Sequence, residues 1–264
     1  MHPSLFTIAG FRFPAYGFMV AVGYLAAIIY LHKKTPGGGL TRDNTADLIF
    51  YSAAGGILGA KAVFAVTYWK ELGPDFSARL LFLFRSFPYG FVFYGGLTAG
   101  AAVFLYYCRR RGLDPLMTLD YFAPALPLAH GFGRVGCFLA GCCHGRAADG
   151  PLSVVFSDPL CEVSRAYLGV ALHPVQLYEA AGNFLIFLGL HILSRKKPGS
   201  GRGLVFSAYI ASYSALRFSL EFLRGDDRGG FWLGLSPAQL FSVIFGFIAL
   251  GIFIRLRKNG KLKV

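Results

Sequence analysis

Seven apolar stretches, each close to the length needed to cross a lipid bilayer, constrain this chain more than any other feature. They cover residues 15–31, 47–67, 89–107, 119–139, 175–193, 204–222 and 235–254. A membrane-spanning helix needs about 20 apolar residues. A chain with 55% apolar and 15% charged residues is also too apolar for a soluble domain. The sequence therefore predicts an all-α, polytopic membrane protein with seven transmembrane helices in a single domain over residues 1–264.

The distribution of basic residues predicts the orientation of these helices. Fifteen Lys and Arg residues lie in the connections on one side of the predicted membrane, and eight lie on the other side. Because cytoplasmic loops carry an excess of positive charge, we expect the N-terminus outside and the C-terminus in the cytoplasm. The net charge of +13 then reflects loops beside anionic membrane lipids, and we expect no nucleic acid partner.

Two of the outer connections are predicted to have structure of their own. Residues 76–87 combine apolar side chains with Arg79 and Arg85 and are too short to span, which favours a helix in the membrane interface. Residues 142–172 contain a strand-like stretch at 153–156 between turn-forming residues. We expect this second segment to form a small extracytoplasmic cap.

Five charged residues lie within the predicted spans, namely Lys61, Arg134, Glu179, Arg217 and Glu221. A buried arginine costs roughly 2.5–3.5 kcal/mol on membrane-insertion scales, so such residues indicate function. His130 and Arg134 are four residues apart and share a helix face. The alternatives are structural, because Arg134 could fill a tight helix crossing and Arg217 could simply pair with Glu221.

The depth of the two arginines favours a lipid phosphate as their ligand. Arg134 and Arg217 each lie about five residues before the outer end of their spans, which is roughly 7–8 Å below the boundary at about 1.5 Å per residue. Lipid phosphates lie at this level, and a guanidinium can donate two parallel hydrogen bonds to one phosphate. A transporter would place such charges nearer the bilayer midplane.

Four of the five cysteines, Cys137, Cys142, Cys143 and Cys161, lie in or after the fourth apolar stretch, and Cys108 stands apart. We expect no metal site, because the spacing lacks the usual Cys-x2-Cys pair and adjacent cysteines rarely ligate one metal well. If the segment faces an oxidising compartment, a disulfide from Cys161 to Cys142 or Cys143 is favoured.

Several segments resemble the signature segments of bacterial prolipoprotein diacylglyceryl transferases. They are GRVGCFLAG at 133–141, HPVQLYE at 173–179, YSALRFSLEFLR at 213–224, Tyr16-Gly17 and YGGL at 94–97. The resemblance runs through nearly the whole chain in the right order. It implies a bacterial inner-membrane enzyme, without a cofactor, that works among membrane lipids. The enzyme would transfer a diacylglyceryl group from phosphatidylglycerol to the lipobox cysteine thiol in a prolipoprotein signal peptide, releasing glycerol phosphate.

Matched residue by residue, Arg134 and Arg217 fall on the family's essential arginines and are predicted to be catalytic. Substrate binding is assigned to Tyr16, Lys61, Gly95, Gly96, Cys137, Gly145, Gln176, Tyr213, Glu221 and Arg224. The chain departs from the family pattern at Tyr94, where a histidine is common, at Cys137, where an asparagine is common, and at Cys142, where an acid is usual. These departures leave open a paralogue that acts on another acceptor. A seven-helix transporter or receptor is a further alternative.

The attacking thiol needs a group that removes its proton, because a thiol with a pKa near about 8.5 is mostly protonated at neutral pH. His130 is the first candidate, since it shares a helix face with Arg134 and an imidazole titrates near neutrality. Tyr94 is the second. Both are predicted to be catalytic.

Overall fold

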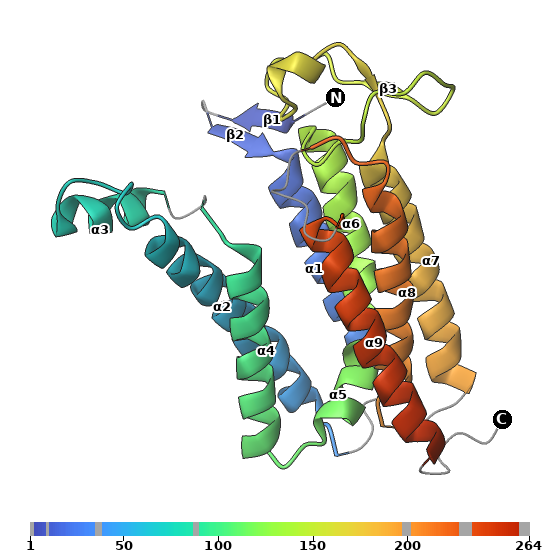
Figure 1. Cartoon of the computed structure of the whole chain (residues 1–264). Coiled ribbons are helices and arrows are strands. Elements are labelled where there is room, and N and C mark those ends of the chain that lie inside the picture. The colour runs from blue at the N-terminus through green and yellow to red at the C-terminus, as the bar shows by residue number, and fades with distance from the viewer. Residues whose placement is uncertain are drawn as a thin grey trace. The chain divides into compact units, whose positions relative to one another are not determined.

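The computed structural model describes residues 3–8, 11–34, 39–86, 90–196, 202–226 and 234–258. Within these residues the chain forms nine α-helices and four short strands, drawn in Figure 1. Contacts between segments divide it into two compact units. Unit 1 comprises Met1–Thr35 and Leu119–Val264, and unit 2 comprises Pro36–Thr118.

Five long helices make up most of unit 1. They are α1 (Ala15–Lys33), α6 (Ala125–Ala140), α7 (Val175–Lys196), α8 (Leu204–Glu221) and α9 (Pro237–Lys258). Contacts join α1 to α6, α6 to α7, α7 to α8 and α8 to α9, and Figure 1 shows these helices running alongside one another. The three helices with the polar motifs, α6, α7 and α8, are therefore neighbours.

The apolar stretch at 119–139 does not form one helix. It is divided between α5 (Pro115–Phe122) and α6, with the break at Ala123 and Pro124. Pro124 precedes the first residue of α6, and a proline has no backbone N–H with which to continue a helix from the preceding turn. The prediction of one continuous helix over residues 119–139 is wrong at this point.

Helix α5 holds the ends of two longer helices. The hydroxyl of Tyr121 donates a hydrogen bond of 2.7 Å to the carbonyl of Leu31, near the end of α1. The carboxylate of Asp120 accepts hydrogen bonds from the backbone N–H groups of Gly203 at 2.7 Å and Phe206 at 2.8 Å, where α8 begins. Both contacts satisfy backbone groups that a helix end otherwise leaves unpaired.

The non-helical parts of unit 1 contain two small antiparallel sheets. β1 (Ser4–Ile8) pairs with β2 (Phe11–Pro14) directly before α1, an arrangement that the sequence did not predict. β3 (Val154–Val155) pairs with β4 (Ala171–Leu172), and a short 3-10 helix, Arg165–Tyr167, lies between them in the chain. The predicted strand at 153–156 is therefore confirmed in its central residues. The segment 142–172, which contains this strand, has a small hydrophobic core of Phe156, Cys161, Val163 and Leu172.

In unit 2, α2 (Arg42–Thr67) packs along α4 (Phe93–Arg110). The two backbones approach closely at glycines. A Cβ atom at Gly95 would lie 2.6 Å from Cγ2 of Val63 and 2.8 Å from the carbonyl oxygen of Gly59. Glycine permits this close approach of two helices, because a larger residue at the same position would clash with the neighbouring helix.

The short helix expected over residues 76–87 forms as α3 (Phe76–Arg85). It begins where the carboxylate of Asp75 accepts a hydrogen bond of 2.7 Å from the backbone N–H of Ala78, an N-cap contact. The last residue of the predicted segment, Phe87, lies outside the described residues.

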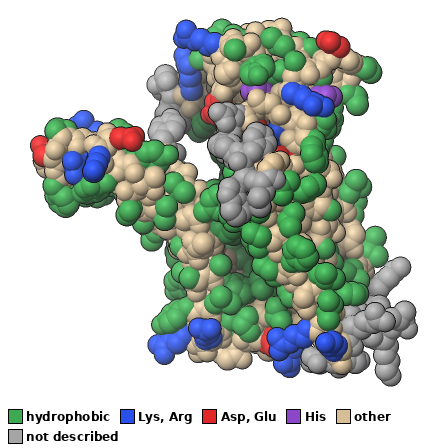
Figure 2. Space-filling model, viewed as in Figure 1, with side chains coloured by type: hydrophobic (Ala, Val, Ile, Leu, Met, Phe, Trp, Pro, Cys, Tyr) green, Lys and Arg blue, Asp and Glu red, His purple; other side chains and the backbone are tan. Residues whose placement is uncertain are grey.

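Among the described residues, four helices are long and apolar enough to cross a membrane, over Ala15–Lys33, Arg42–Thr67, Val175–Arg195 and Pro237–Leu256. Helix α6 has only 16 residues, and α8 carries charged residues near its end. Figure 2 shows hydrophobic side chains over the middle of the helices and Lys and Arg side chains towards their ends. The predicted helical membrane protein is confirmed in this coarser form, while the count of seven spans and the orientation stay predictions.

Candidate functional site

One buried carboxylate, that of Glu179 near the start of α7, is the centre of the polar contacts in unit 1. Its side chain is 1% exposed. Its Oε1 lies 3.0 Å from Nη2 of Arg134 and accepts a hydrogen bond of 3.0 Å from the hydroxyl of Tyr213. Its Oε2 lies 4.0 Å from Nη1 of Arg224. Because a buried charge is costly without partners, Glu179 and these three groups hold one another in place.

His130 and Arg134 share one face of α6, as their spacing predicted. Nε of Arg134 donates a hydrogen bond of 3.2 Å to Nε2 of His130. The same imidazole nitrogen lies 3.7 Å from Oε1 of Glu179, and the ring lies against Tyr213 with 5.1 Å between centroids. The lone pair of His130 Nε2 is therefore engaged by the guanidinium, and the imidazole helps to orient Arg134.

A second ion pair lies near the end of α8. Nη1 of Arg217 lies 2.6 Å from Oε2 of Glu221, and the hydroxyl of Ser236 donates a hydrogen bond of 2.6 Å to Oε1 of Glu221. Nε of Arg224 lies 4.0 Å from Oε2 of the same carboxylate. Since Arg224 also faces Glu179, it links the two ion pairs.

We call this group the arginine cluster; its members are Arg134, Arg217, Arg224, Glu179, Glu221 and Asp226. The carboxylate of Asp226 accepts two hydrogen bonds of 2.8 Å from Arg224. Three arginines thus face three acids, so the cluster does not attract an anion through net charge. It offers an anion N–H donors that the carboxylates already hold in fixed directions.

Arg217 is the arginine whose donors are least satisfied. Its side chain is 8% exposed, and Nη2 has no hydrogen-bond partner among the described residues. Nη1 is close to Glu221, but the two groups are not aligned as a hydrogen bond. Buried donors without acceptors cost free energy, and a phosphate oxygen is the acceptor that a guanidinium fork fits best. Arg217 is therefore prepared for an anionic ligand.

Tyr16, at the start of α1, lies beside this site and is 47% exposed. Its phenol is an electrostatic neighbour of Arg134 and of the Cys137 thiol. Gly136 on α6 makes this approach possible, because a Cβ atom there would lie 3.2 Å from the carbonyl oxygen of Tyr16 and 3.0 Å from Cβ of Met19. The structure thus brings Tyr16 to the arginine cluster.

Gly145 and Gln176 fix the loop that follows α6. The side-chain amide of Gln176, which is 1% exposed, donates a hydrogen bond of 2.8 Å to the carbonyl of Cys142. The backbone N–H of Gly145 donates to the carbonyl of His173 at 3.0 Å, and Gly145 also forms a β-bridge with Arg224. A Cβ atom at Gly145 would lie 2.5 Å from that His173 oxygen. The loop is therefore attached to the start of α7 and to the end of α8.

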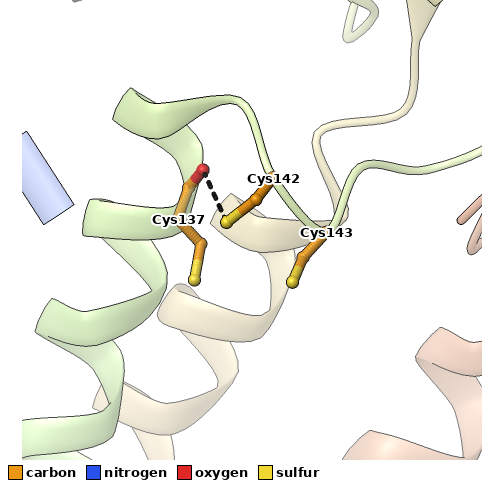
Figure 3. A group of neighbouring side chains, drawn as sticks. All are labelled: Cys137, Cys142 and Cys143. Atoms are coloured by element: carbon orange, nitrogen blue, oxygen red, sulfur yellow. Dashed lines mark hydrogen bonds between the residues drawn. The ribbon is translucent and has the colours of Figure 1, made fainter. Parts of the chain in front are cut away.

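Three thiols lie together at the end of α6 (Figure 3). The Sγ atoms of Cys137, Cys142 and Cys143 all lie within 4.8 Å of one another. All five cysteines are among the described residues and none forms a disulfide, so the bridge predicted from Cys161 is absent. Cys161 packs instead in a hydrophobic core, where burial raises the pKa of its thiol.

Lys61 belongs to unit 2 and is 9% exposed. Its Nζ donates a hydrogen bond of 2.9 Å to the carbonyl of Ser86. The ammonium also lies over two aromatic rings, 5.2 Å from the centroid of Phe64 and 5.5 Å from that of Phe91. These contacts satisfy a buried cation within its own unit.

The remaining predicted site residues, Tyr94, Gly95 and Gly96, also lie in unit 2. Tyr94 is 45% exposed at the start of α4. Gly95 and Gly96 face α2, where a Cβ atom at Gly96 would lie 3.0 Å from the carbonyl oxygen of Gly56. Close packing of α4 against α2 is therefore a sufficient reason for glycine at both positions.

Glu179 is the important residue that the site assignment from sequence missed. Its position as an acid inside an apolar stretch was a usable signal, because intramembrane acids are rarely without function. Its role depends on α7 lying between α6 and α8, since Arg134 is on α6, Tyr213 is on α8 and Arg224 follows α8. Spacing along one helix could not reveal contacts to two others.

Comparison with known proteins gives consistent results over nearly the whole chain. The family model described as Prolipoprotein diacylglyceryl transferase matches residues 3–255. A Clostridium tetani protein named phosphatidylglycerol–prolipoprotein diacylglyceryl transferase is 37% identical over 264 residues, covering 98% of this chain and 100% of that protein.

Two further relatives have similar names. The Clostridium perfringens protein, phosphatidylglycerol–prolipoprotein diacylglyceryl transferase 2, is 34% identical and covers 92% of this chain and 90% of its own length. The Pseudoalteromonas atlantica transferase is 32% identical, with 97% and 90% covered. With a family match and relatives of this length and identity, the chain belongs to the prolipoprotein diacylglyceryl transferase family.

Proposed function

We propose that this protein transfers the diacylglyceryl group of phosphatidylglycerol to the lipobox cysteine thiol of a prolipoprotein and releases glycerol phosphate. The names of the relatives state this donor and acceptor for those proteins. They do not favour the alternatives of a different acceptor, a transporter or a receptor. The arginine cluster also supports the proposal, because its guanidiniums can donate hydrogen bonds to a lipid phosphate.

The observation that carries the proposal is the unpaired, buried Nη2 of Arg217. A phosphodiester placed against it accepts the hydrogen bonds that the protein leaves unmade. Arg134 donates to the same phosphate from α6, and Arg224 lies 4.0 Å from both carboxylates that hold the other two arginines. Planar guanidiniums suit this task because their donors match two phosphate oxygens at once.

During transfer, the acceptor sulfur forms a bond to the glyceryl carbon while the C–O bond to phosphate breaks. The electron pair of that bond stays on the phosphate oxygen, where negative charge grows. Fixed donors aimed at such an oxygen contribute about 10²–10³ in rate each. Glu179 and Glu221 hold Arg134 and Arg217 before the substrate arrives, so little reorganisation is needed at the moment of reaction.

Neighbouring side chains complete the lipid site in this proposal. Tyr16, half-exposed beside Arg134, and Tyr213, hydrogen-bonded to Glu179, flank the phosphate. Gln176 and Gly145 hold the loop after α6 in position around it.

In the membrane, we propose seven spans with the N-terminus outside, in the bacterial inner membrane. The excess of basic residues in the cytoplasmic loops supports this orientation. Helix α3, with its exposed phenylalanines and Arg85, suits the interface. The segment 142–172, with its own small core, forms the extracytoplasmic cap.

The test uses phosphatidylglycerol labelled in its acyl chains, a lipobox peptide and the purified protein in detergent or proteoliposomes. We expect label to move to the peptide, and not to a peptide with serine in place of the cysteine. Arg217→Lys should lower transfer by about 10²–10³ while the protein stays folded, because a lysine does not reproduce the two-donor fork.

The matched control is Arg165→Lys, at an exposed arginine in the cap segment, which should keep wild-type activity. Label that reaches the serine peptide equally well would overturn the cysteine thiol as the acceptor. Full activity of Arg217→Lys would remove the phosphate role of Arg217.

A further inference from the structure

The thiol group of Cys137, Cys142 and Cys143 has no part in the mechanism so far. One member comes from the last turn of α6 and two from the loop that follows it, as Figure 3 shows. In the described part of the chain, this is the one set of cysteine, histidine and acidic side chains that meets the geometry of a metal site.

We propose that Cys137, Cys142 and Cys143 bind one Zn²⁺ ion through three thiolates, and that the thiol of the acceptor peptide completes the coordination as the fourth ligand. The first half concerns this chain alone. The second half rests on the proposed function.

The backbone brings the two loop cysteines back to the helix. Gly141 ends α6 with φ of 82°, and the backbone N–H of Cys142 then donates to the carbonyl of Cys137 at 3.2 Å. Cys143 has a φ of 60°. Among the described residues, it is the only one other than glycine with a positive φ. Side chains disfavour this conformation, and residues held in it cluster at functional sites.

The conformation of Cys143 also answers the objection that adjacent cysteines ligate one metal poorly. In extended backbone, neighbouring side chains point to opposite sides. Here the left-handed residue turns the chain so that the thiols of Cys142 and Cys143 both approach Cys137. The hydrogen bond from Gln176 to the carbonyl of Cys142 fixes the loop in this form.

The distances suit zinc after a small adjustment. Zinc binds thiolates at about 2.3 Å with tetrahedral geometry, which places bound sulfur atoms about 3.8 Å apart. The three Sγ atoms lie within 4.8 Å of one another, so closing on the ion requires shifts of roughly 1 Å or less, within reach of side-chain rotation.

The surrounding charge also suits a thiolate site. Arg134 is an electrostatic neighbour of Cys137 and Cys143, and Arg224 is an electrostatic neighbour of Cys143. Nearby guanidiniums favour the ionised form of a thiol, and three thiolates around one Zn²⁺ carry a net charge of only −1. Three protein ligands with one open position are the arrangement of catalytic zinc, whereas structural sites use four.

An open zinc position supplies what the arginine cluster lacks, a means of ionising the acceptor thiol. His130 is poorly placed to take the proton, because its Nε2 accepts a hydrogen bond from Arg134. A thiol that coordinates zinc is deprotonated by the metal itself. Since Tyr16 is an electrostatic neighbour of all three thiols and of Arg134, the metal and the phosphate would lie in one site.

The acceptor thiol binds zinc and its proton passes to water. The zinc-bound sulfur then gives an electron pair to the glyceryl carbon, and the C–O bond to phosphate breaks with its pair on the phosphate oxygen. The thioether product and glycerol phosphate leave, and zinc stays Zn²⁺ throughout.

The first measurement needs no turnover. The full-length protein, purified with a histidine-free tag, should contain one zinc per chain by elemental analysis. Cys137→Ala and Cys142→Ala should lose it, while Cys108→Ala and Cys161→Ala should retain it, since those residues lie outside the thiol group. No zinc in the wild-type protein, or a disulfide among the three residues, would overturn the site.

The second measurement asks whether the fourth ligand is the acceptor. With Co²⁺ in place of zinc, sulfur-to-cobalt absorption should appear, and a lipobox peptide should change the cobalt spectrum where the serine peptide does not. In the transfer assay, Cys137→Ala should be about 30-fold slower near pH 7, because only about 3% of a free thiol is ionised there, and the deficit should shrink as pH rises.

These readouts separate the two proposals. Zinc that depends on Cys137 in a protein that transfers no lipid would sink the proposed function and leave the metal site standing. Transfer at wild-type rate by Cys137→Ala would overturn the metal's role and leave the proposed function intact. A deficit that is constant with pH would also overturn that role.

Discussion

The α2–α4 pair of unit 2 and the α6–α7–α8 group of unit 1 bring helices together in different ways. At α2 and α4 the contact is made by small residues, and Lys61 is satisfied by a carbonyl and two rings. At α6, α7 and α8 the contact is made by three arginines and two buried carboxylates, with Arg217 left partly unpaired.

The two regions differ in how completely the protein itself provides partners for a buried cation. Both regions bury cations, but Lys61 has partners within its own unit, whereas Arg217 has donors without acceptors among the described residues. Buried charged donors without acceptors are costly, which is why we propose a ligand at Arg217 and none at Lys61.

The largest effect is expected at Glu179. Glu179→Leu leaves Arg134 and Arg224 without a shared buried carboxylate, and breaking a buried pair from one side costs about 3–5 kcal/mol in the free energy of unfolding. Transfer should be abolished and the denaturation midpoint in detergent should fall. Wild-type stability and activity would show that the cluster does not depend on this carboxylate.

His130 comes next, and two substitutions distinguish its possible roles. His130→Phe removes the acceptor for Arg134 Nε and should slow transfer by about 10²-fold, because a displaced guanidinium loses its alignment. His130→Gln keeps an acceptor oxygen and should recover much of the rate. If the two variants are equally slow and the pH–rate profile loses its acidic limb, His130 acts as the base and the positioning role is wrong.

A smaller effect, on stability alone, is expected at the α2–α4 contact. Gly95→Ala places a methyl group 2.6 Å from Val63 and 2.8 Å from a backbone oxygen, and overpacking of this kind costs about 1–3 kcal/mol in the free energy of unfolding. The matched control is Gly246→Ala on α9, where no atom lies within 4 Å of the added methyl group. Thermal unfolding in detergent should separate the two variants.

The smallest effect of the four is expected at Lys61. Lys61→Met keeps the length of the side chain and removes a cation that contacts Ser86, Phe64 and Phe91 of unit 2, so activity should stay within about threefold of wild type. The assignment of Lys61 to substrate binding predicts a much larger loss. A hundredfold loss in a folded variant would support that assignment and break the distinction between the two regions.

Much of the fold follows from local patterns that the sequence displays. The apolar stretches predicted the helices, and α3 formed where a short amphipathic segment was expected. The break between α5 and α6 was the exception, because the apolar character of 119–139 continued across Pro124. The hydropathy of residues 119–139 shows that they are apolar. It does not show that Pro124 divides them into two helices.

The sequence alone determined the helical membrane class, the family resemblance and the pairs that one helix face brings together, such as His130 with Arg134 and Arg217 with Glu221. These follow from composition and from a fixed helical repeat. Only the tertiary structure decided that Glu179 joins α6 to α8 and that three thiols meet beyond α6. Those contacts depend on which helices are neighbours and on the left-handed turn at Cys143, and neither is encoded in spacing along the chain.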